Sequence, residues 1–380
     1  MQDKFMIRLQ SKAVTLSFFV ILLVSCQQPD NGESFRSAMK TYFNSIVQAD
    51  GPGGAVLVMK DTTVIYTDAI GWADMNTKEP ITTRTLFNLG SISKTFVSNG
   101  ILMLQQQGKL SVEDSLLKYF PNFKNKEIAR KVKIKHLLTH TSGLPDNRQV
   151  SKDSVFFLTA NDEQNWYPVT QTDTLEFEPG TRYQYSNPAF NALALIIQQV
   201  TGMPWQRFIS ETIFVPSGMK TSTITDGPHP QSGVSHGYTK IAGQWLEDDF
   251  GEEPTFCAAG NGGVWSSVEE LARYELALRR ATFLDKTSID SSFTIRNFSS
   301  WKGDQPPFIG WSWFIDSTPD NRKVISHTGH QGGFAAYYMN VPEEQILIVV
   351  LFNAPYDVYA FRENVMTQLA KNNWLNEVRN

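Results

Sequence analysis

At residues 87–96 the chain reads FNLGSISKTF, and residues 97–107, which follow, contain no proline and are mostly apolar or helix-forming. This pattern predicts a buried helix with Ser91 in its first turn. Because residues three apart on a helix are neighbours, the Lys94 amine can lie beside the Ser91 hydroxyl. A serine becomes a good nucleophile only with an adjacent base, and a desolvated lysine is one such base. The free N–H groups at a helix N-terminus also suit a developing oxyanion.

Two later triplets complete a set of motifs. Tyr-Ser-Asn occupies residues 185–187, and His-Thr-Gly occupies residues 327–329 after an apolar run. The order Ser-x-x-Lys, Tyr-x-Asn, Lys/His-Thr-Gly resembles that of the serine hydrolases built on the class C β-lactamase and D-alanyl-D-alanine carboxypeptidase fold, a penicillin-binding protein-like, β-lactamase-related family. Further stretches that look like this family are GSISKTF at 90–96, HLLTHTSGLP at 136–145, EPG at 178–180 and PSGM at 216–219. The resemblance covers the chain from residue 36 to residue 370.

The resemblance implies a catalytic role for three side chains. Ser91 would attack a carbonyl carbon and become acylated, while Lys94 and Tyr185 would move protons. A buried tyrosine beside an ammonium group can have its pKa lowered, because the phenolate gains an opposite charge, and Tyr185 is the candidate second base. Which of Lys94 and Tyr185 is the base stays open, since a coupled pair titrates together.

The same resemblance implies the remaining site residues. The substrate-binding residues would be Asn187, His327, Thr328 and Gly329, and the oxyanion hole would consist of the backbone N–H groups of Ser91 and His330. Asn187 would hydrogen-bond a substrate amide or hold Lys94 in place. The substrate is expected to be a small molecule or a peptide. No metal and no organic cofactor is implied.

His327 departs from the β-lactamase pattern, because those enzymes carry a lysine there. A histidine with the ordinary pKa of about 6.5 is mostly neutral at pH 7. We therefore expect an esterase-like or peptidase-like hydrolase whose relative activity on anionic substrates rises from about pH 8 to 6. Arg362, in the last helix, could reach the same substrate carboxylate and mask this effect.

Two alternative functions stay open. The chain could be a true β-lactamase or a D-alanyl-D-alanine carboxypeptidase. From a different class, it could be a non-catalytic penicillin-binding sensor or scaffold on the same fold. The complete set of Ser91, Lys94 and Tyr185 argues against the sensor, because a binding module does not need all three.

The first 25 residues have the features of a bacterial lipoprotein signal. Three basic residues precede an uncharged, mainly apolar run at 13–24, which is too short to span a bilayer, and LVSC at 23–26 resembles a lipoprotein cleavage box. We expect cleavage before Cys26, a lipid on Cys26 and a polar tether at 26–34. A plain secretory signal or an uncleaved anchor stays open. The sequence thus predicts an exported, lipid-anchored protein of the bacterial cell envelope, facing the periplasm or the cell surface.

The charge content argues against nucleic-acid binding, and the cysteine content argues against an intramolecular disulfide. Lys and Arg number 34 against 38 Asp and Glu, for a net charge of −4, and no block of five basic residues occurs. Nucleic-acid binding therefore lacks an electrostatic basis. If Cys26 is lipidated, Cys257 is left without a partner for an intramolecular disulfide.

The apolar patterns predict an α/β (α+β) fold with an antiparallel sheet formed by both chain ends and flanked by helices. Helix patterns occur at 35–47 and 358–369, and strand patterns occur at 54–60, 63–70, 323–327, 335–340 and 346–352. The last strand is apolar throughout, so both of its faces should be covered. We expect residues 35–109 and 300–380 to form this sheet lobe.

Residues 110–299 are expected to form an inserted, mainly helical lobe. Its helix patterns lie at 188–200, 205–214 and 268–281, the last with Ser266 and Glu269 as a possible capping box.

Three other motifs offer alternatives to these assignments. His136 and His140 have a possible zinc spacing, but Leu137 stands where His-Glu-x-x-His needs glutamate, so we expect a packed pair. GVSHG at 233–237 matches the Gly-x-Ser-x-Gly elbow, but a turn-rich stretch precedes Ser235 and a strand-like stretch follows it. We expect a loop that enters a hairpin. The Ser-Asp-Asn of class A β-lactamases is absent.

Overall fold

The computed structural model describes residues 31–146, 148, 160–227, 229–248, 257–296 and 308–376. The predicted signal segment and Cys26 lie outside these residues. The tether expected at 26–34 does not end where predicted, because helix α1 (Asn31–Ile46) begins inside it. The helix starts early since Phe35 is already fully buried against the sheet.

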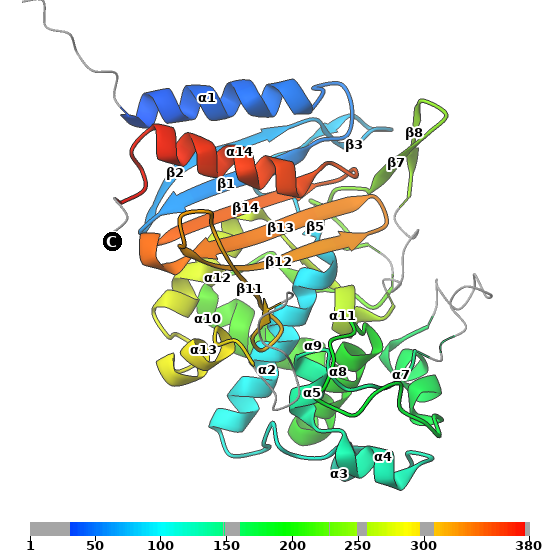
Figure 1. Cartoon of the computed structure of the whole chain (residues 1–380). Helices are drawn as coiled ribbons and strands as arrows, with labels where there is room; N and C mark the ends of the chain where they lie inside the picture. The colour runs from blue at the N-terminus through cyan, green and yellow to red at the C-terminus, as the bar shows by residue number, and fades with distance from the viewer. Residues whose placement is uncertain are drawn as a thin grey trace, which may run out of the picture.

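A seven-stranded antiparallel sheet, with the strand order β10-β11-β12-β13-β14-β1-β2, forms the upper half of the molecule in Figure 1. Its strands are β1 (Gly54–Lys60), β2 (Thr63–Ile70), β10 (Phe308–Ile309), β11 (Phe314–Ser317), β12 (Lys323–Gln331), β13 (Phe334–Val341) and β14 (Ile346–Phe352). β1 pairs with β2 on one side and with β14 on the other. The prediction that both chain ends build the sheet is therefore confirmed. The strand predicted at 323–327 is longer and reaches Gln331.

The two faces of β14 belong to two different hydrophobic cores. Its even-numbered residues from Ile346 to Phe352 pack in the outer core, with α1 and α14 (Val358–Lys371). Its odd-numbered residues from Leu347 to Leu351 pack in the inner core. Successive side chains of a strand point to opposite faces, which explains why the run is apolar throughout.

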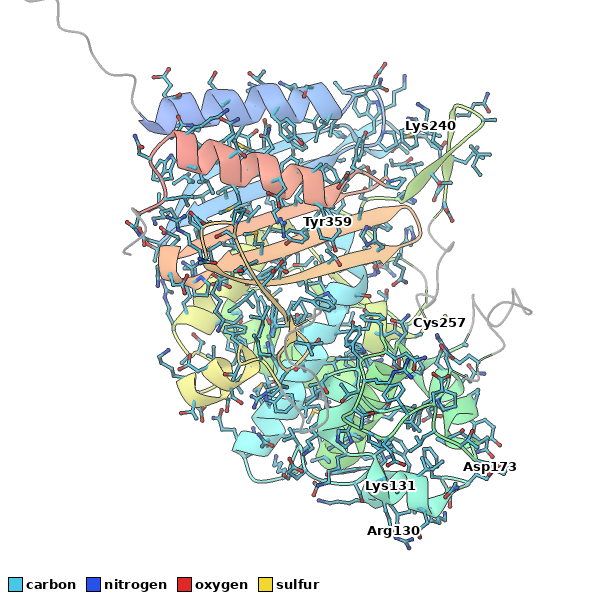
Figure 2. All side chains as sticks on the ribbon, viewed as in Figure 1. Arg130, Lys131, Asp173, Lys240, Cys257 and Tyr359 are labelled. Atoms are coloured by element: carbon cyan, nitrogen blue, oxygen red, sulfur yellow. The ribbon has the colours of Figure 1, made fainter. Side chains whose placement is uncertain are left out.

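The helices of the inner side lie below the sheet in Figure 1. They are α2 (Ser93–Gln106), α3 (Leu116–Tyr119), α4 (Lys126–Lys131), α5 (Ile134–Leu138), α7 (Asp162–Thr170), α8 (Pro188–Thr201), α9 (Trp205–Ile209), α10 (Val215–Ser217), α11 (Ala259–Gly262), α12 (Val268–Arg279) and α13 (Lys286–Ser292). Short strands pair as β3 (Trp72–Asp74) with β4 (Glu79–Pro80), and as β5 (Phe87–Asn88) with β9 (Val264–Ser266) and β6 (Thr223–Ile224). β7 (Tyr238–Ile241) and β8 (Gln244–Glu247) form a projecting hairpin that carries Lys240 (Figure 2).

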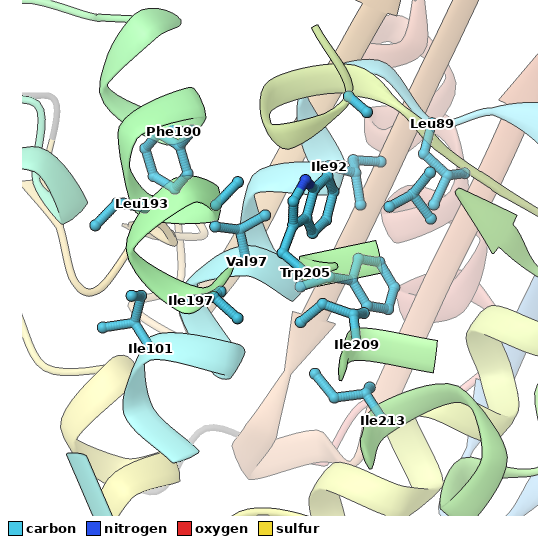
Figure 3. Close-up of a cluster of buried hydrophobic side chains, with 14 of the residues drawn as sticks. Leu89, Ile92, Val97, Ile101, Phe190, Leu193, Ile197, Trp205, Ile209 and Ile213 are labelled. Atoms are coloured by element: carbon cyan, nitrogen blue, oxygen red, sulfur yellow. The ribbon is translucent and has the colours of Figure 1, made fainter. Parts of the chain in front are cut away.

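Helix α2 runs through the middle of the inner core and is buried from Ser93 to Leu104. Figure 3 shows Val97 and Ile101 of α2 in one buried cluster with Leu193 and Ile197 of α8. This burial explains the mostly apolar composition of residues 97–107. It also fixes the start of α2 inside the protein.

Two predicted helices differ in detail. The helix expected at 205–214 is α-helical only to Ile209 and continues as a π-helical turn (Ser210–Phe214). The cap of α12 is Ser267, whose side chain accepts from the N–H of Glu270, rather than Ser266 with Glu269. The pattern Ser-x-x-Glu occurs twice in adjacent registers, and pattern alone does not choose between them.

Within the described ranges, no helix combines the length and apolar character that crossing a membrane requires. The division into a sheet lobe at 35–109 and 300–380 and a helical lobe at 110–299 stays a prediction.

Candidate active site

Ser91 and Lys94 lie side by side where α2 begins. Ser91 belongs to a 3₁₀ turn (Gly90–Ile92), and Lys94 lies in the first turn of α2. The prediction that placed Ser91 in the first turn of the α-helix is therefore corrected, because the α-helix begins at Ser93, after the 3₁₀ turn. A 3₁₀ turn has three residues per turn, so it still brings Lys94 next to Ser91. The Lys94 Nζ lies 2.9 Å from Ser91 Oγ, and Ser91 is partly exposed.

The Lys94 side chain is completely buried. Its Nζ donates a hydrogen bond to the backbone carbonyl of Asn261 at 2.8 Å and lies 5.2 Å from the centre of the Tyr185 ring. Burial holds the pKa of Lys94 well below its usual range, and the positive charge of Arg148 lowers it further. This shift favours the neutral amine, which is the form that a general base requires.

Tyr185 contacts the serine from the loop before α8. Its hydroxyl hydrogen-bonds the Ser91 side chain, and its ring stacks on His140 with the centres 4.3 Å apart. His140 is held in turn, because its Nδ1 accepts the N–H of Ser186 at 3.0 Å. Although Tyr185 is 38% exposed, burial of its hydroxyl end raises its pKa. The lowering that an ammonium neighbour could cause does not occur, because burial of the Tyr185 hydroxyl dominates and burial of Lys94 favours its neutral amine.

Strand β12 supplies the other wall of the site. β11 pairs only with residues 323–326 of β12, so along the described chain the edge of β12 is open from His327 onward. β13 covers its other edge as far as Gln331. The open edge faces the 3₁₀ turn that carries Ser91, and Thr328 is partly exposed on it.

Two glycines allow the 3₁₀ turn and β12 to touch. A Cβ on Gly329 would lie 1.9 Å from the Leu89 carbonyl oxygen and 3.2 Å from the Ser91 N. Gly90 has a positive φ of 49°, and a Cβ there would lie 2.8 Å from the His330 N. The two N–H groups expected to form the oxyanion hole therefore belong to backbone segments in direct contact.

His327, the first residue of the third motif, is buried, with 1% of its surface exposed. Its Nδ1 lies 2.6 Å from the Thr328 carbonyl oxygen. Burial lowers the pKa of His327 to about 3; the hydrogen bond to Thr328 opposes this shift and the nearby Lys94 adds to it. The titration expected between pH 8 and 6 is therefore wrong. Arg362 does not replace the charge, because it donates to the Tyr337 hydroxyl at 3.1 Å in the outer core.

Several buried polar atoms around Ser91 have no hydrogen-bond partner in the described part of the chain. They are Asn187 Oδ1, His140 Nε2, Asn261 Oδ1 and His327 Nε2. Since nearly all buried polar atoms in proteins are paired, such a cluster indicates groups that bond to a substrate or to solvent. Asn187 does not hold Lys94 through its oxygen as one expectation had it, and the Asn261 carbonyl takes that place.

Two alternative sites do not form. His136 Nδ1 accepts the Lys133 N–H at 3.1 Å, and His140 stacks on Tyr185. No group of three His, Cys, Asp or Glu side chains in the described ranges could hold a metal ion. Ser235 is fully buried and leads into the β7–β8 hairpin, as predicted.

The sequence did not reveal the roles of two residues of the site, Asn261 and Arg148. The Asn261 carbonyl is a backbone group, which no side-chain motif reveals. The Arg148 side chain is 1% exposed and bound to Asp146 at 2.6 Å and to Asn165 at 2.9 Å. An arginine in a polar loop gives no signal of such burial.

Comparison with known proteins identifies relatives in sequence and in fold. The chain is 28% identical over 341 residues to penicillin-binding protein 4* of Bacillus subtilis, covering 85% of this chain and 72% of that protein. It is 28% identical over 329 residues to a D-aminopeptidase of Brucella anthropi, covering 83% of this chain but only 59% of that protein. An octameric penicillin-binding protein homologue from Pyrococcus abyssi has the same fold, with a TM-score of 0.76 and 24% identity over 88% of this chain and 77% of that one. The Beta-lactamase family model matches residues 35–370, so the chain belongs to the Beta-lactamase family.

Proposed function

We propose that this protein is a serine hydrolase that cleaves an ester or amide bond through an acyl-enzyme on Ser91. The observation that carries this proposal is the distance of 2.9 Å between the Ser91 hydroxyl and the amine of the fully buried Lys94. A binding module gains nothing from burying a lysine against a serine, because the burial of a cationic group is unfavourable. A hydrolase gains a neutral base beside its nucleophile.

In the first step, Ser91 Oγ attacks the substrate carbonyl carbon and its proton passes to Lys94 Nζ. The carbonyl π electrons move onto the oxygen, which the N–H groups of Ser91 and His330 would stabilise. Tyr185 is a protonated phenol beside Ser91 Oγ, and it donates its proton to the leaving oxygen or nitrogen. The leaving group departs as an alcohol or amine, and the Lys94 ammonium returns a proton to Tyr185.

In the second step, water attacks the Ser91 ester. The same groups act in reverse order. The attacking water gives a proton to Tyr185 as the Tyr185 proton passes to Lys94 Nζ. The Lys94 ammonium then returns a proton to Ser91 Oγ as the carboxylic acid departs. The raised pKa keeps Tyr185 protonated, so it has a proton to donate, and the lowered pKa keeps Lys94 neutral, so it can accept one. Lys94 is therefore the base in this proposal.

We further propose neutral esters or peptides as preferred substrates over anionic β-lactams. The support is His327, which is neutral because its pKa lies near 3, so this wall offers no positive charge to a carboxylate. The D-aminopeptidase relative is named for a peptidase activity. True β-lactamase or carboxypeptidase activity is the second candidate, favoured by the Bacillus subtilis relative, which is named a penicillin-binding protein.

Export and lipid attachment at Cys26 are also proposed. Their support is the short apolar run that ends in LVSC at residues 23–26. Native protein should partition with membranes and carry acyl chains, while Cys26→Ser should carry none. Mass spectrometry that finds an intact residue 1 in protein from the native host would rule this out.

A covalent probe tests the catalytic proposal. A fluorophosphonate should modify Ser91, as mapped by peptide mass spectrometry, and Ser91→Ala should abolish labelling and lower ester hydrolysis by about 10³-fold or more. Ser235→Ala is the matched control and should retain activity within a few-fold of wild type, because its hydroxyl contacts only backbone oxygens. Labelling at Ser235, or labelling that survives Ser91→Ala, would refute the assignment.

A further inference from the structure

A buried carboxylate lies behind the active site at the start of α7. Asp162 is 7% exposed and accepts three hydrogen bonds, all from neutral N–H groups. Its Oδ1 accepts from Asn191 Nδ2 at 2.6 Å and from the Gly260 N–H at 2.9 Å, and its Oδ2 accepts from Trp205 Nε1 at 2.9 Å. Asp162 thus joins α7, α8, α9 and α11 at one point.

Two routes lead from this carboxylate to the catalytic lysine, and both pass through the four-residue helix α11. The direct route is the Gly260 N–H. The second runs through Asn191, whose Oδ1 accepts from Asn261 Nδ2 at 2.8 Å. The Asn261 carbonyl in turn accepts from Lys94 Nζ at 2.8 Å. A single helical turn has little stability of its own, so these contacts fix where the Asn261 carbonyl lies.

We propose that Asp162 is a positioning residue, whose carboxylate holds α11 so that the Asn261 carbonyl keeps the Lys94 amine directed at Ser91. This inference rests on the proposed function. Burying a carboxylate is unfavourable unless hydrogen bonds compensate it, and here three N–H groups from three other helices converge on it. The structure keeps the carboxylate where it acts on the catalytic lysine through two hydrogen-bonded links.

An amide cannot replace the carboxylate. The two carboxylate oxygens accept all three N–H groups, whereas asparagine offers one oxygen and one NH₂ group. In Asp162→Asn, the NH₂ group would face either the Trp205 N–H or the pair from Asn191 and Gly260. One side of the network must move, and a displacement of about 1 Å at a catalytic group can lower the rate by about 10²-fold.

The test compares Asp162→Asn with Asp173→Asn, a matched change at a surface ion pair with Lys124, at the end of the molecule far from the sheet (Figure 2). The readouts are kcat and KM for a p-nitrophenyl ester and the rate of fluorophosphonate labelling. At about pH 8, Asp162→Asn should lower kcat and the labelling rate by about 10- to 10²-fold with little change in KM. Asp173→Asn should match wild type.

The pH dependence separates positioning from a merely structural role. Burial raises the pKa of Asp162 to about 6, so protonation makes wild type resemble the variant, and the ratio of their kcat values should fall toward unity below that pH. Asp226 raises this pKa further. Of the elements packed on Asp162, α8 and α11 carry no titratable side chain. Glu163 on α7 is exposed, and Arg207 on α9 is paired with Glu211 at the surface.

A second variant, Trp205→Phe, separates the positioning role of Asp162 from a general loss of stability in Asp162→Asn. Trp205→Phe removes only the Oδ2 donor and keeps the links to α11. It should lower the melting temperature and leave kcat within a few-fold of wild type. If Asp162→Asn keeps wild-type kcat per labelled site, or loses the same factor at every pH, the positioning role is refuted. If wild type is not labelled at Ser91 at all, the proposed function fails first.

Discussion

Ser91 and Ser235 each stand in a sequence that matches a known nucleophile motif, and their surroundings differ completely. Ser91 is partly exposed, with a buried amine 2.9 Å away and a phenol in contact. Ser235 is fully buried, and among the described residues its hydroxyl has only the backbone oxygens of Ala73 and His236 as acceptors, each at 3.3 Å. A serine without a base keeps the reactivity of an alcohol. The base and the access path, rather than the spacing of letters, distinguish a nucleophile from a packed hydroxyl.

The backbone gives the same contrast. The 3₁₀ turn of Ser91 faces an open strand edge, where donors are available to a substrate. The N–H of Ser235 is already bonded to the Leu86 carbonyl at 2.8 Å. A nucleophile elbow needs a helix after the serine, and a β-hairpin follows Ser235 instead. The glycines around Ser235 therefore serve a turn.

Lys94→Met should have the largest effect, because it removes the feature that separates the two serines. Methionine fills a similar volume without a base, so kcat/KM for a p-nitrophenyl ester should fall by about 10³-fold, within the range for loss of a general base. Lys286→Met, at a side chain that is 82% exposed, should change nothing. Activity within tenfold of wild type would assign the base to Tyr185 instead.

The same variant should be more stable than wild type. The folded pKa of Lys94 lies below its unfolded value, so the unfolded chain binds more protons between the two values and wild-type stability rises with pH there. The buried amine thus lowers wild-type stability at neutral pH, and methionine lacks this penalty. The melting temperature of Lys94→Met should exceed that of wild type, with the gap widening as pH falls. A lower melting temperature at all pH values would contradict the burial argument.

Gly329→Ala and Gly233→Ala compare the glycines of the two motifs. The Cβ at residue 329 would lie 1.9 Å from the Leu89 carbonyl, which must push β12 away from the 3₁₀ turn. We expect at least about a 10²-fold loss of kcat, comparable to removing one oxyanion donor. A Cβ at residue 233 meets nothing within 4 Å, although its φ of +69° is strained. Gly233→Ala should therefore lower the melting temperature slightly and keep kcat; equal losses of kcat in both variants would contradict this account.

Tyr185→Phe tests the phenol beside Ser91. The loss of the leaving-group donor should lower kcat by about 10²-fold, at the lower end for acid–base catalysis. The ring still stacks on His140, so folding should be preserved. The loss should be larger for an amide than for a p-nitrophenyl ester, because an amine leaving group needs the proton more. Equal losses for both substrates would indicate that Tyr185 acts through packing alone.

The sequence predicted the two covered faces of β14, the sheet built by both chain ends and the adjacency of Ser91 and Lys94. These follow from periodicity and spacing, which are local. It did not predict the pKa of Tyr185, which is raised rather than lowered, or the pKa of His327, which lies far below its ordinary value. Those shifts depend on burial, which is set by the packing of distant segments such as the wall from β12.

The same limit applies to the network behind Lys94. Asp162, Asn191 and the Asn261 carbonyl are separated by many residues and have no shared motif. Each is an ordinary polar residue until the fold places it within hydrogen-bond distance of the next. The sequence also left the register of the α12 cap undecided, because adjacent residues offered equivalent patterns.

His327→Lys should have the smallest effect and concerns what the open edge of β12 accepts. In wild type, His327 stays neutral, so the ratio of kcat/KM for a chromogenic cephalosporin to that for a p-nitrophenyl ester should not change between about pH 8 and 6 through this residue. A lysine would add a charge for the substrate carboxylate. A charged hydrogen bond contributes about 1.5–3 kcal/mol, or about one to two powers of ten.

The gain should fall at the lower end, about tenfold, because residue 327 is 1% exposed and burial beside Lys94 would favour the neutral form of a new amine. His327→Gln, which is neutral at every pH, is the control and should keep the wild-type ratio. A wild-type ratio that rises several-fold on acidification while His327→Gln stays flat would show that His327 titrates near 6.5 after all. An unchanged ratio in His327→Lys would mean that another group binds the substrate carboxylate. The buried Arg148, whose positive charge lowers the pKa of Lys94, would then be the first residue to replace.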